Sequence, residues 1–307
     1  MPGKSTIEPI HALNCVLEDA RENKKELWLL FQDMSKAYDR VNRNYLFKAL
    51  ERINIPANFI RLIENSLSKR TNKIITSVGY TEEYIMKNGI DQEEVISPLL
   101  WIIYYNPLFE RINQNHNLAY ELKVDFTWQN NQVIQKKGIN SVVYMDDSTF
   151  IAPSKYAMSE QLKIADSFNA LTGILVNANK SELIVINSDN EINSIRYGNN
   201  EYEIMAKRAD EPIRFLGVWI LGQKNDQFIM NQVKDEINLA VNHLKRKRIT
   251  SQQIVYVFNA VIVPRIEYRC NLSTFTEKKC EKLQVPIRQL LRHKCGLVNT
   301  LPNASSG

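Results

Sequence analysis

Residues 142–151 read VVYMDDSTFI, so that two short apolar and β-branched runs flank the acidic pair Asp146-Asp147. These runs predict the two strands of a β-hairpin with the acids at its tip. Adjacent carboxylates are a poor choice for a tight turn, because Asn-Gly or Asp-Gly fits the backbone better. One interpretation is a solvated acidic turn. The other is a site for a hard divalent cation such as Mg²⁺ or Mn²⁺, which would offset the repulsion between the two carboxylates.

A third acid, Asp33, follows a run that predicts a buried strand. Residues 27–31, LWLLF, are too apolar for the surface and too few for an isolated helix. Beyond Asp33, residues 42–54 show helical periodicity. The apolar face of that helix carries Leu46, Leu50 and Ile53. A carboxylate at the end of a central strand, facing two more on a hairpin, can bind two divalent ions about 3.5–4 Å apart, as in-line phosphoryl transfer requires.

Five segments are similar, in order, to motifs of one known family. Residues 33–39, DMSKAYD, resemble the first catalytic motif of reverse transcriptases, and residues 144–147, YMDD, resemble their YxDD box. Residues 89–92 with 96–100 resemble the template-gripping loop and helix. Residues 177–181 resemble the motif after the YxDD box, and residues 214–217 resemble the primer-grip strand. The wording SKAYD and SPLL most resembles the non-LTR, LINE-type retrotransposon enzymes.

The resemblance implies an α+β fold of the right-hand polymerase type, with an antiparallel palm sheet, incomplete fingers and a helical thumb. It assigns residues 1–224 to partial fingers and palm, and residues 225–307 to a helical thumb-like region. Family members carry further fingers strands upstream and often an endonuclease. We therefore expect this chain to be a fragment or a truncated copy of a retroelement.

The activity implied by the resemblance is that of an RNA-directed DNA polymerase. Such an enzyme transfers a nucleotidyl group from a dNTP to a primer 3′-OH, using an RNA template, a DNA primer and two Mg²⁺ or Mn²⁺ ions. The implied metal ligands are Asp33, Asp146 and Asp147. Because adjacent residues of a strand point oppositely, Asp147 is the weakest candidate of the three.

Other site residues are also implied by the resemblance. Lys180 would protonate the departing pyrophosphate, which is general-acid work that suits an amine. The ring of Tyr38 would collide with a ribose 2′-OH and so favour deoxynucleotides. The residues implied at the incoming nucleotide are Ser35, Lys36, Tyr38 and Gln92.

Several of these residues also have a plain structural interpretation. Tyr38 suits a core aromatic, and Lys180, after the strand-like residues 174–176, suits a surface lysine. Ser97-Pro98 is a good helix start, with a side-chain cap and a proline at the first helical position, and it predicts a helix that continues over residues 99–112.

The chain departs from the family at Glu93, where a glycine is usual. Glycine permits close approach of the backbone to a ligand, whereas Glu93 adds bulk and negative charge near a polyanion. This departure favours an alternative function, a catalytically inactive nucleic-acid-binding remnant. A two-metal nuclease on an unrelated fold is a further alternative, which the ordered motifs disfavour.

Charge and periodicity characterise the last third of the chain. The formal net charge is +5, and much of the excess lies in three basic clusters, at residues 245–248, 278–282 and 288–294. A helical stripe contains Ile229, Val233, Ile237, Ala240 and Leu244, and a second apolar helix is predicted from Ile254 to Val263, ending at Pro264. Basic helices suit contacts with nucleic-acid phosphates. Solvated helix surfaces, or a nuclear-import signal at residues 245–248, are the alternatives.

Composition places the chain among globular proteins without a membrane segment. Hydrophobic residues make up 44% and charged residues 24% of the 307 residues, and no apolar run is long enough to span a bilayer. Four scattered cysteines predict reduced thiols in an intracellular protein, nuclear or cytoplasmic. Two polar stretches stand out: residues 113–140, a loop or an inserted β-ribbon, and residues 187–211, which predict a hairpin.

Overall fold

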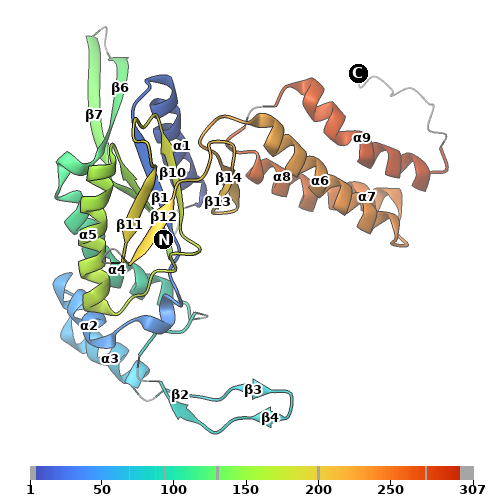
Figure 1. Cartoon of the computed structure of the whole chain (residues 1–307). Helices are drawn as coiled ribbons and strands as arrows, with labels where there is room; N and C mark the ends of the chain where they lie inside the picture. Colours follow the sequence, from blue (N-terminus) through green and yellow to red (C-terminus); the bar gives the residue numbers. More distant parts are fainter. Residues whose placement is uncertain are drawn as a thin grey trace. The chain divides into compact units, whose positions relative to one another are not determined.

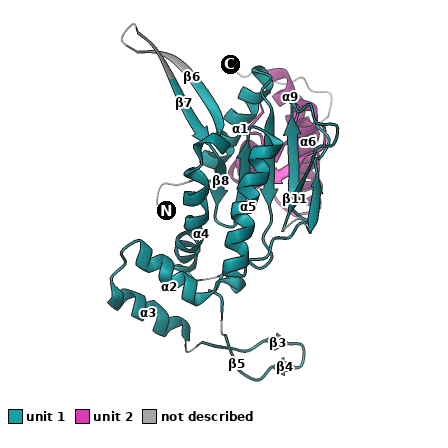
Figure 2. Ribbon diagram, turned by 60° about the vertical axis from the view of Figure 1, so that its left-hand side comes forward, with its two compact units in different colours: residues 1–209 teal, residues 210–307 magenta. Residues whose placement is uncertain are grey.

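The computed structural model describes residues 5–68, 70–86, 88–92, 94–128, 131–198, 201–273 and 275–297. The chain forms two compact units, residues 1–209 and 210–307, coloured separately in Figure 2. The sequence places a boundary at 224/225 instead. The units divide earlier because a hairpin at residues 213–220 contacts the helices that follow it.

A four-stranded antiparallel sheet forms the centre of the first unit (Figure 1). Its strands lie in the order β10-β1-β9-β8, with bounds Glu182–Ile186, Leu27–Gln32, Asp147–Ala152 and Ser141–Tyr144. All six residues of β1 are buried, as its apolar run predicts. The predicted hairpin is confirmed, because β8 pairs with β9. Strand β9 also pairs with β1, the strand that precedes Asp33.

Helices cover this sheet, and their apolar periodicity explains how. Trp28 and Leu30 of β1 point to the same face and share a core with Trp101, Met158 and other apolar residues of two helices. These helices are α4 (Ser97–Asn113) and α5 (Lys155–Thr172). The other helices of the unit are α1 (Ile7–Glu22), which contacts β8, and the pair α2 (Arg43–Arg52) and α3 (Ala57–Ser68).

Two helix predictions need correction. Ile53 lies beyond the end of α2 and is 40% exposed, so only Leu46 and Leu50 of the expected stripe are buried. Ser97 does not cap α4, because it is the first residue of the helix and Ile96 occupies the capping position. Among the described residues, the buried Ser97 Oγ has no hydrogen-bond partner. Pro98 is the second residue of α4, one position later than predicted.

A long two-stranded ribbon occupies much of the polar stretch at residues 113–140. It pairs β6 (Tyr120–Trp128) with β7 (Asn131–Ile139) and follows a short 3₁₀ turn, η2 (His116–Leu118). The β-ribbon alternative is therefore correct. Figure 1 shows this ribbon projecting from the body of the unit.

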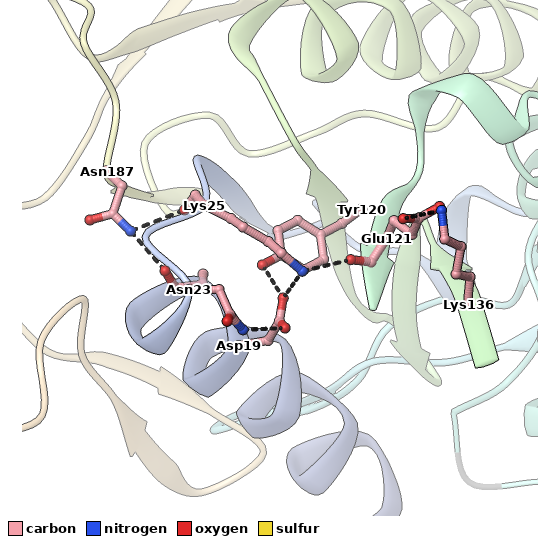
Figure 3. A network of polar contacts seen from close by, with 8 residues as sticks. Asp19, Asn23, Lys25, Tyr120, Glu121, Lys136 and Asn187 are labelled. Atoms are coloured by element: carbon pink, nitrogen blue, oxygen red, sulfur yellow. Dashed lines mark hydrogen bonds and ion pairs between the residues drawn. The ribbon is translucent and has the colours of Figure 1, made fainter. Parts of the chain in front are cut away.

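Polar contacts tie the base of the ribbon to α1 (Figure 3). Asp19 accepts hydrogen bonds from the Tyr120 hydroxyl at 2.6 Å and from Lys25 Nζ at 2.7 Å. Lys25 also donates to the Glu121 carbonyl at 3.2 Å, and Asn187 Nδ2 donates to the Lys25 carbonyl at 3.1 Å. Burial opposes the ionised form of Asp19, but the contacts with Lys25 and Tyr120 prevail and lower its pKa. These contacts hold the base of the ribbon to α1.

The remaining strands of the first unit form short antiparallel pairs. The predicted hairpin at residues 187–211 is confirmed by the pair β11 (Ser194–Tyr197) and β12 (Tyr202–Met205). Between α3 and α4 the chain forms a largely exposed arm of two pairs, β2 with β5 and β3 with β4. Their bounds are Thr71–Asn72, Tyr84–Ile85, Ile75–Thr76 and Gly79–Tyr80.

The second unit is a small hairpin followed by helices. Strands β13 (Ile213–Phe215) and β14 (Val218–Ile220) are joined by Leu216 and Gly217, both at positive φ, and the Tyr268 hydroxyl donates to the Leu216 carbonyl. The helices are α6 (Asp226–Lys245), α7 (Ser251–Val257), α8 (Val263–Arg269) and α9 (Glu277–Lys294). Ile229, Val233 and Ile237 are buried, as their stripe predicts.

The predicted helix end at Pro264 is wrong. A π-helical segment, η3 (Phe258–Ile262), joins α7 directly to α8, and Pro264 lies in the first turn of α8. Proline lacks an N–H and crowds the carbonyl of the preceding turn, and the wider π turn relieves both problems without ending the helix.

Two further properties follow from the described residues. None of the described helices is both long and apolar enough to cross a membrane. All four cysteines carry free thiols, as their scattered positions predict.

Candidate active site

The strand register brings Asp33 to the hairpin acids. The last registered pair of β1 and β9 is Gln32 with Ser148, so the next position along both strands sets Asp33 beside Asp147. Across the hairpin, Tyr144 pairs with Asp147, which leaves Met145 and Asp146 as the turn. The three acids therefore share one end of the central sheet.

The electrostatics of these acids reflect their proximity. Desolvation raises the pKa of Asp147, and the negative charges of Asp146 and Asp33 raise it further. Burial likewise raises the pKa of the Tyr38 hydroxyl, and the charge of Asp146 adds to that shift. Asp146, Asp147, Asp33 and Tyr38 therefore surround one region of negative potential.

The donor set suits a hard divalent cation by its chemistry, although its carboxylates are not gathered closely around one point. Within the described part of the chain, no three Asp, Glu, His or Cys side chains form a ready metal-binding group. Asp33, Asp146 and Asp147 nevertheless offer carboxylate oxygens at one strand end, and the charges of Asp33 and Asp146 raise the pKa of Asp147. Carboxylate oxygens are the ligands that Mg²⁺ and Mn²⁺ prefer, and a cation would relieve this repulsion.

The segment after α5 holds the backbone of Asp33. The Asp33 N–H donates to Ser181 Oγ at 3.1 Å, and the Asn177 N–H donates to the Asp33 carbonyl at 2.9 Å. The Ser35 N–H donates to the Leu175 carbonyl at 2.8 Å. Two motifs that lie far apart in the sequence, residues 33–39 and 177–181, are thus joined around the first acid.

Lys180 lies on this same segment, and the segment is not the strand that its apolar residues predict. Residues 174–176 make a single β-bridge, from Val176 to Met34, and Leu175 is 51% exposed. Lys180 is exposed on the turn that follows, and its N–H donates to the Asn177 carbonyl at 3.1 Å. Lys180 therefore lies between Asn177 and Ser181, the two residues that hold the Asp33 backbone, and directly precedes Ser181.

Tyr38, in the first of the predicted motifs, contacts the predicted template-gripping loop and the helix that follows it. It begins a 3₁₀ turn, η1 (Tyr38–Arg40), and its ring stacks on Trp101 of α4 with 5.6 Å between ring centroids. Its carbonyl accepts from the Ile90 N–H at 3.0 Å. Gly89 has φ +90°, and a Cβ there would lie 2.9 Å from the Asp39 carbonyl oxygen, so the loop fits only with glycine.

The other predicted nucleotide-site residues lie on the loops around this turn. Gln92 is exposed three residues after Gly89. Lys36 is exposed with φ +53°, and the Ser35 carbonyl accepts from Arg40 Nε at 3.0 Å. Glu93, the departure from the family, lies outside the described residues.

The sequence gives no distinct signal for two residues that contact the site. Ser181 accepts from the Asp33 N–H, and Trp101 Nε1 donates to the Met145 carbonyl at 2.9 Å. Ser181 stands out only as a member of the motif at residues 177–181, and a buried tryptophan on a helix indicates nothing beyond packing. Both contacts join residues remote in sequence, which local patterns do not reveal.

One family of known proteins matches most of this chain. Residues 1–220 match the reverse transcriptase (RNA-dependent DNA polymerase) family. The chain therefore belongs to the reverse transcriptase family, and the antiparallel sheet with its acidic hairpin is the palm of a right-hand polymerase fold.

Curated relatives of the chain include Pol polyproteins of retrotransposable elements. The chain is 19% identical over 299 residues to the Pol polyprotein of the type-2 retrotransposable element R2DM of Drosophila melanogaster, and 20% identical over 299 residues to that of the type-1 element R2 of Bradysia coprophila. These matches cover 95% and 96% of this chain but 26% and 32% of the relatives. The chain thus spans about a third or less of the curated relatives it matches.

The solved structures similar to this chain include telomerases. The telomerase of Candida albicans in complex with the TWJ fragment of telomeric RNA has a TM-score of 0.49 and 13% identity. The match covers 97% of this chain and 52% of the telomerase chain. A truncated apo telomerase of Candida tropicalis has a TM-score of 0.43 and 20% identity, covering 63% and 38%.

Replacing Asp147 by Asn should stabilise the metal-free protein. Because the folded-state pKa of Asp147 is raised, the folded chain holds its proton more tightly than the unfolded chain does. Stability is then lost as pH rises from the ordinary value of 3.8 through the raised value. The melting temperature of Asp147→Asn should therefore exceed that of wild type by a margin that grows from acid to neutral pH.

Thermal melts across that pH range in a chelator test this expectation. The control is Asp189→Asn, which removes an exposed carboxylate after β10, at the opposite end of the sheet from Asp33. A constant margin between Asp147→Asn and wild type at every pH would show that the three acids do not repel one another in the folded protein.

Proposed function

We propose that this chain catalyses template-directed DNA synthesis on an RNA template. The observation that carries the proposal is the convergence of Asp33, Asp146 and Asp147 at the end of the palm sheet, which the register and the raised pKa of Asp147 support. The oxygen of a primer 3′-OH would attack the α-phosphorus of a dNTP. A bond would form between that oxygen and the α-phosphorus while the bond from the α-phosphorus to pyrophosphate breaks, and the hydroxyl proton would pass to water.

The proposed metal ligands are Asp33, Asp146 and Asp147. Two Mg²⁺ or Mn²⁺ ions held there would lower the pKa of the primer hydroxyl and offset the charge of pyrophosphate. The role of the protein is to keep the carboxylates together. The contacts of Asn177 and Ser181 with the Asp33 backbone, and the pairing of the hairpin with β1, support that role.

The proposed nucleotide site lies around Tyr38. Its ring is held against Trp101 close to the charge of Asp146, and we assign it the exclusion of a ribose 2′-OH. Ser35, Lys36 and Gln92 are proposed to contact the triphosphate or the template base, and Lys180 to protonate the leaving pyrophosphate. The exposure of Lys36, Gln92 and Lys180 supports access to a ligand.

The proposed partners are an RNA template and a DNA primer. Residues 245–248 of the second unit, Lys-Arg-Lys-Arg, are all exposed, and α9 contributes further basic residues near its end. Exposed cations of this density suit phosphate contacts that add affinity without sequence preference. The catalytically inactive nucleic-acid-binding remnant stays the second candidate, because of Glu93.

Replacing Glu93 by Gly should raise primer extension. The change removes a carboxylate from the neighbourhood of phosphates and restores close approach of the backbone. The gain should appear in the apparent affinity for dNTP or template, measured from initial rates over a range of dTTP and of poly(rA)/oligo(dT) concentrations.

The double variant Glu93→Gly with Asp146→Asn is the control. It should lose the gain, since a better-shaped pocket cannot replace a metal ligand. Equal or lower activity in Glu93→Gly would mean that the loop already accommodates the glutamate in this lineage.

A further inference from the structure

Trp101 makes a polar contact with the turn of the acidic hairpin. The indole is fully buried on α4, four residues after the helix begins. Its Nε1–H donates to the Met145 carbonyl at 2.9 Å, across 44 residues of sequence. Met145 lies directly between Tyr144 and Asp146, at the tip of the hairpin.

The Met145 carbonyl belongs to the peptide plane that precedes Asp146. Because a peptide unit is planar, fixing that carbonyl also fixes the backbone nitrogen and the Cα of Asp146, the atom from which its side chain leaves. Met145 itself has φ +57°, which residues other than glycine rarely adopt. Surrounding contacts must therefore hold the turn in this conformation, and the indole bond is one of them.

The indole is itself held by rings on more than one side. It stacks on Tyr38 at 5.6 Å and on Tyr105 at 5.1 Å between centroids, with interplanar angles of 22° and 25°. Tyr105 is buried, and its hydroxyl accepts from Gln32 Nε2 at 3.3 Å, at the end of β1. The same indole thus contacts the proposed nucleotide gate and the turn that carries a proposed metal ligand.

We propose that Trp101 is a positioning residue for the polymerase reaction, which orients Asp146 through the hydrogen bond to the Met145 carbonyl. It touches no reacting atom, and it acts through the turn. This inference rests on the proposed function. It predicts that loss of the indole N–H, with the aromatic ring kept, impairs metal binding and the chemical step more than it impairs folding.

Trp101→Phe is the test variant, and Trp28→Phe is the matched control. Trp28 is also fully buried in the same core, and its Nε1 also donates a hydrogen bond, to Glu26 Oε1 at 2.7 Å. It lies five residues before Asp33 on β1, roughly 16 Å away along the strand. Each variant therefore removes one indole N–H donor from the same core. Only Trp101→Phe removes a hydrogen bond to the hairpin turn.

Three measurements on the full chain separate positioning from packing. They are the melting temperature, the affinity for Mn²⁺ from the electron paramagnetic resonance signal of the free ion, and kcat and KM for dTTP on poly(rA)/oligo(dT). We expect similar losses of melting temperature in the two variants. Only Trp101→Phe should bind Mn²⁺ more weakly and lose about 10- to 100-fold in kcat, with KM little changed. Equal Mn²⁺ affinity and equal kcat in the two variants would overturn the proposal.

A cavity beside the indole allows chemical rescue. Trp101, Tyr105, Phe109 and Met145 are among the residues that line this cavity, which has a volume of about 450 Å³. Trp101→Ala would join the vacated space to that cavity, so that added indole can enter. Indole should restore Mn²⁺ affinity and extension, whereas benzothiophene, of similar size but without an N–H, should not. Equal rescue by both compounds would show that Trp101 only fills space.

Failure of the proposed function has a different signature. A wild-type chain that binds Mn²⁺ but extends no primer would contradict the polymerase activity, while the Mn²⁺ affinities of Trp101→Phe and Trp28→Phe would still decide the role of Trp101. A wild-type chain that neither binds Mn²⁺ nor extends a primer would overturn both proposals.

Discussion

Asp146→Asn should reduce primer extension by at least about 10³-fold, because it removes a proposed metal ligand and several kcal/mol of transition-state stabilisation. Asp33→Asn should have an effect of the same order, since both carboxylates lie at the end of the palm sheet and their charges raise the pKa of Asp147. The loss should fall on kcat, with nucleic-acid affinity retained. Single-nucleotide extension of poly(rA)/oligo(dT) at saturating dTTP measures it directly.

The control for these variants is Asp189→Asn, an isosteric change of an exposed carboxylate far along the sheet. It should leave extension unchanged. If Asp146→Asn kept more than about a tenth of the wild-type rate, corresponding to less than about 1.4 kcal/mol, the hairpin acids would not hold the catalytic ions.

The largest effect on binding is expected from the basic cluster at residues 245–248. Replacing all four side chains by Gln should lower affinity for an RNA–DNA duplex by about 10²- to 10³-fold at roughly 0.15 M salt, if each contacts a phosphate. The slope of log affinity against log salt should flatten by about 0.9 for each phosphate that the variant no longer neutralises. Fluorescence anisotropy over a series of salt concentrations measures both quantities.

Lys163→Gln serves as the control, because it removes one exposed charge from α5 in the first unit. It should leave the salt slope unchanged. An unaltered slope in the four-residue variant would mean that the cluster faces solvent, and its nuclear-import interpretation would then be the better one. The melting temperature of this variant should equal that of wild type, since all four side chains are exposed.

Local patterns predict the elements of this protein well. The apolar run at residues 27–31 gives a strand with every residue buried, and the runs around Asp146-Asp147 give the paired strands β8 and β9. The predicted helical stripe is observed on α6, where Ile229, Val233 and Ile237 are buried. These elements follow from alternation and helical periodicity, which are properties of short segments.

Such patterns do not predict contacts between segments that lie far apart in the sequence. The bond from the Asp33 N–H to Ser181 spans 148 residues, and that from Trp101 to Met145 spans 44, so neither leaves a periodic signal. The helix end predicted at Pro264 is wrong for a different reason, because the π turn η3 precedes the proline and the helix continues into α8. The roles of the site residues came from resemblance to reverse transcriptase motifs, whereas their meeting at one sheet end came from the strand register.

Primer extension by the wild-type chain is the decisive measurement for the proposed activity. The chain is incubated with poly(rA), labelled oligo(dT), dTTP and either Mg²⁺ or Mn²⁺, with the Asp146→Asn variant beside it. We expect wild type to lengthen the labelled primer in the presence of a divalent ion, and the variant to leave it unchanged. Retained binding without extension would instead identify an inactive remnant, and shortening of the primer would identify a nuclease; either result would contradict the assignment of Asp33, Asp146 and Asp147 to DNA synthesis.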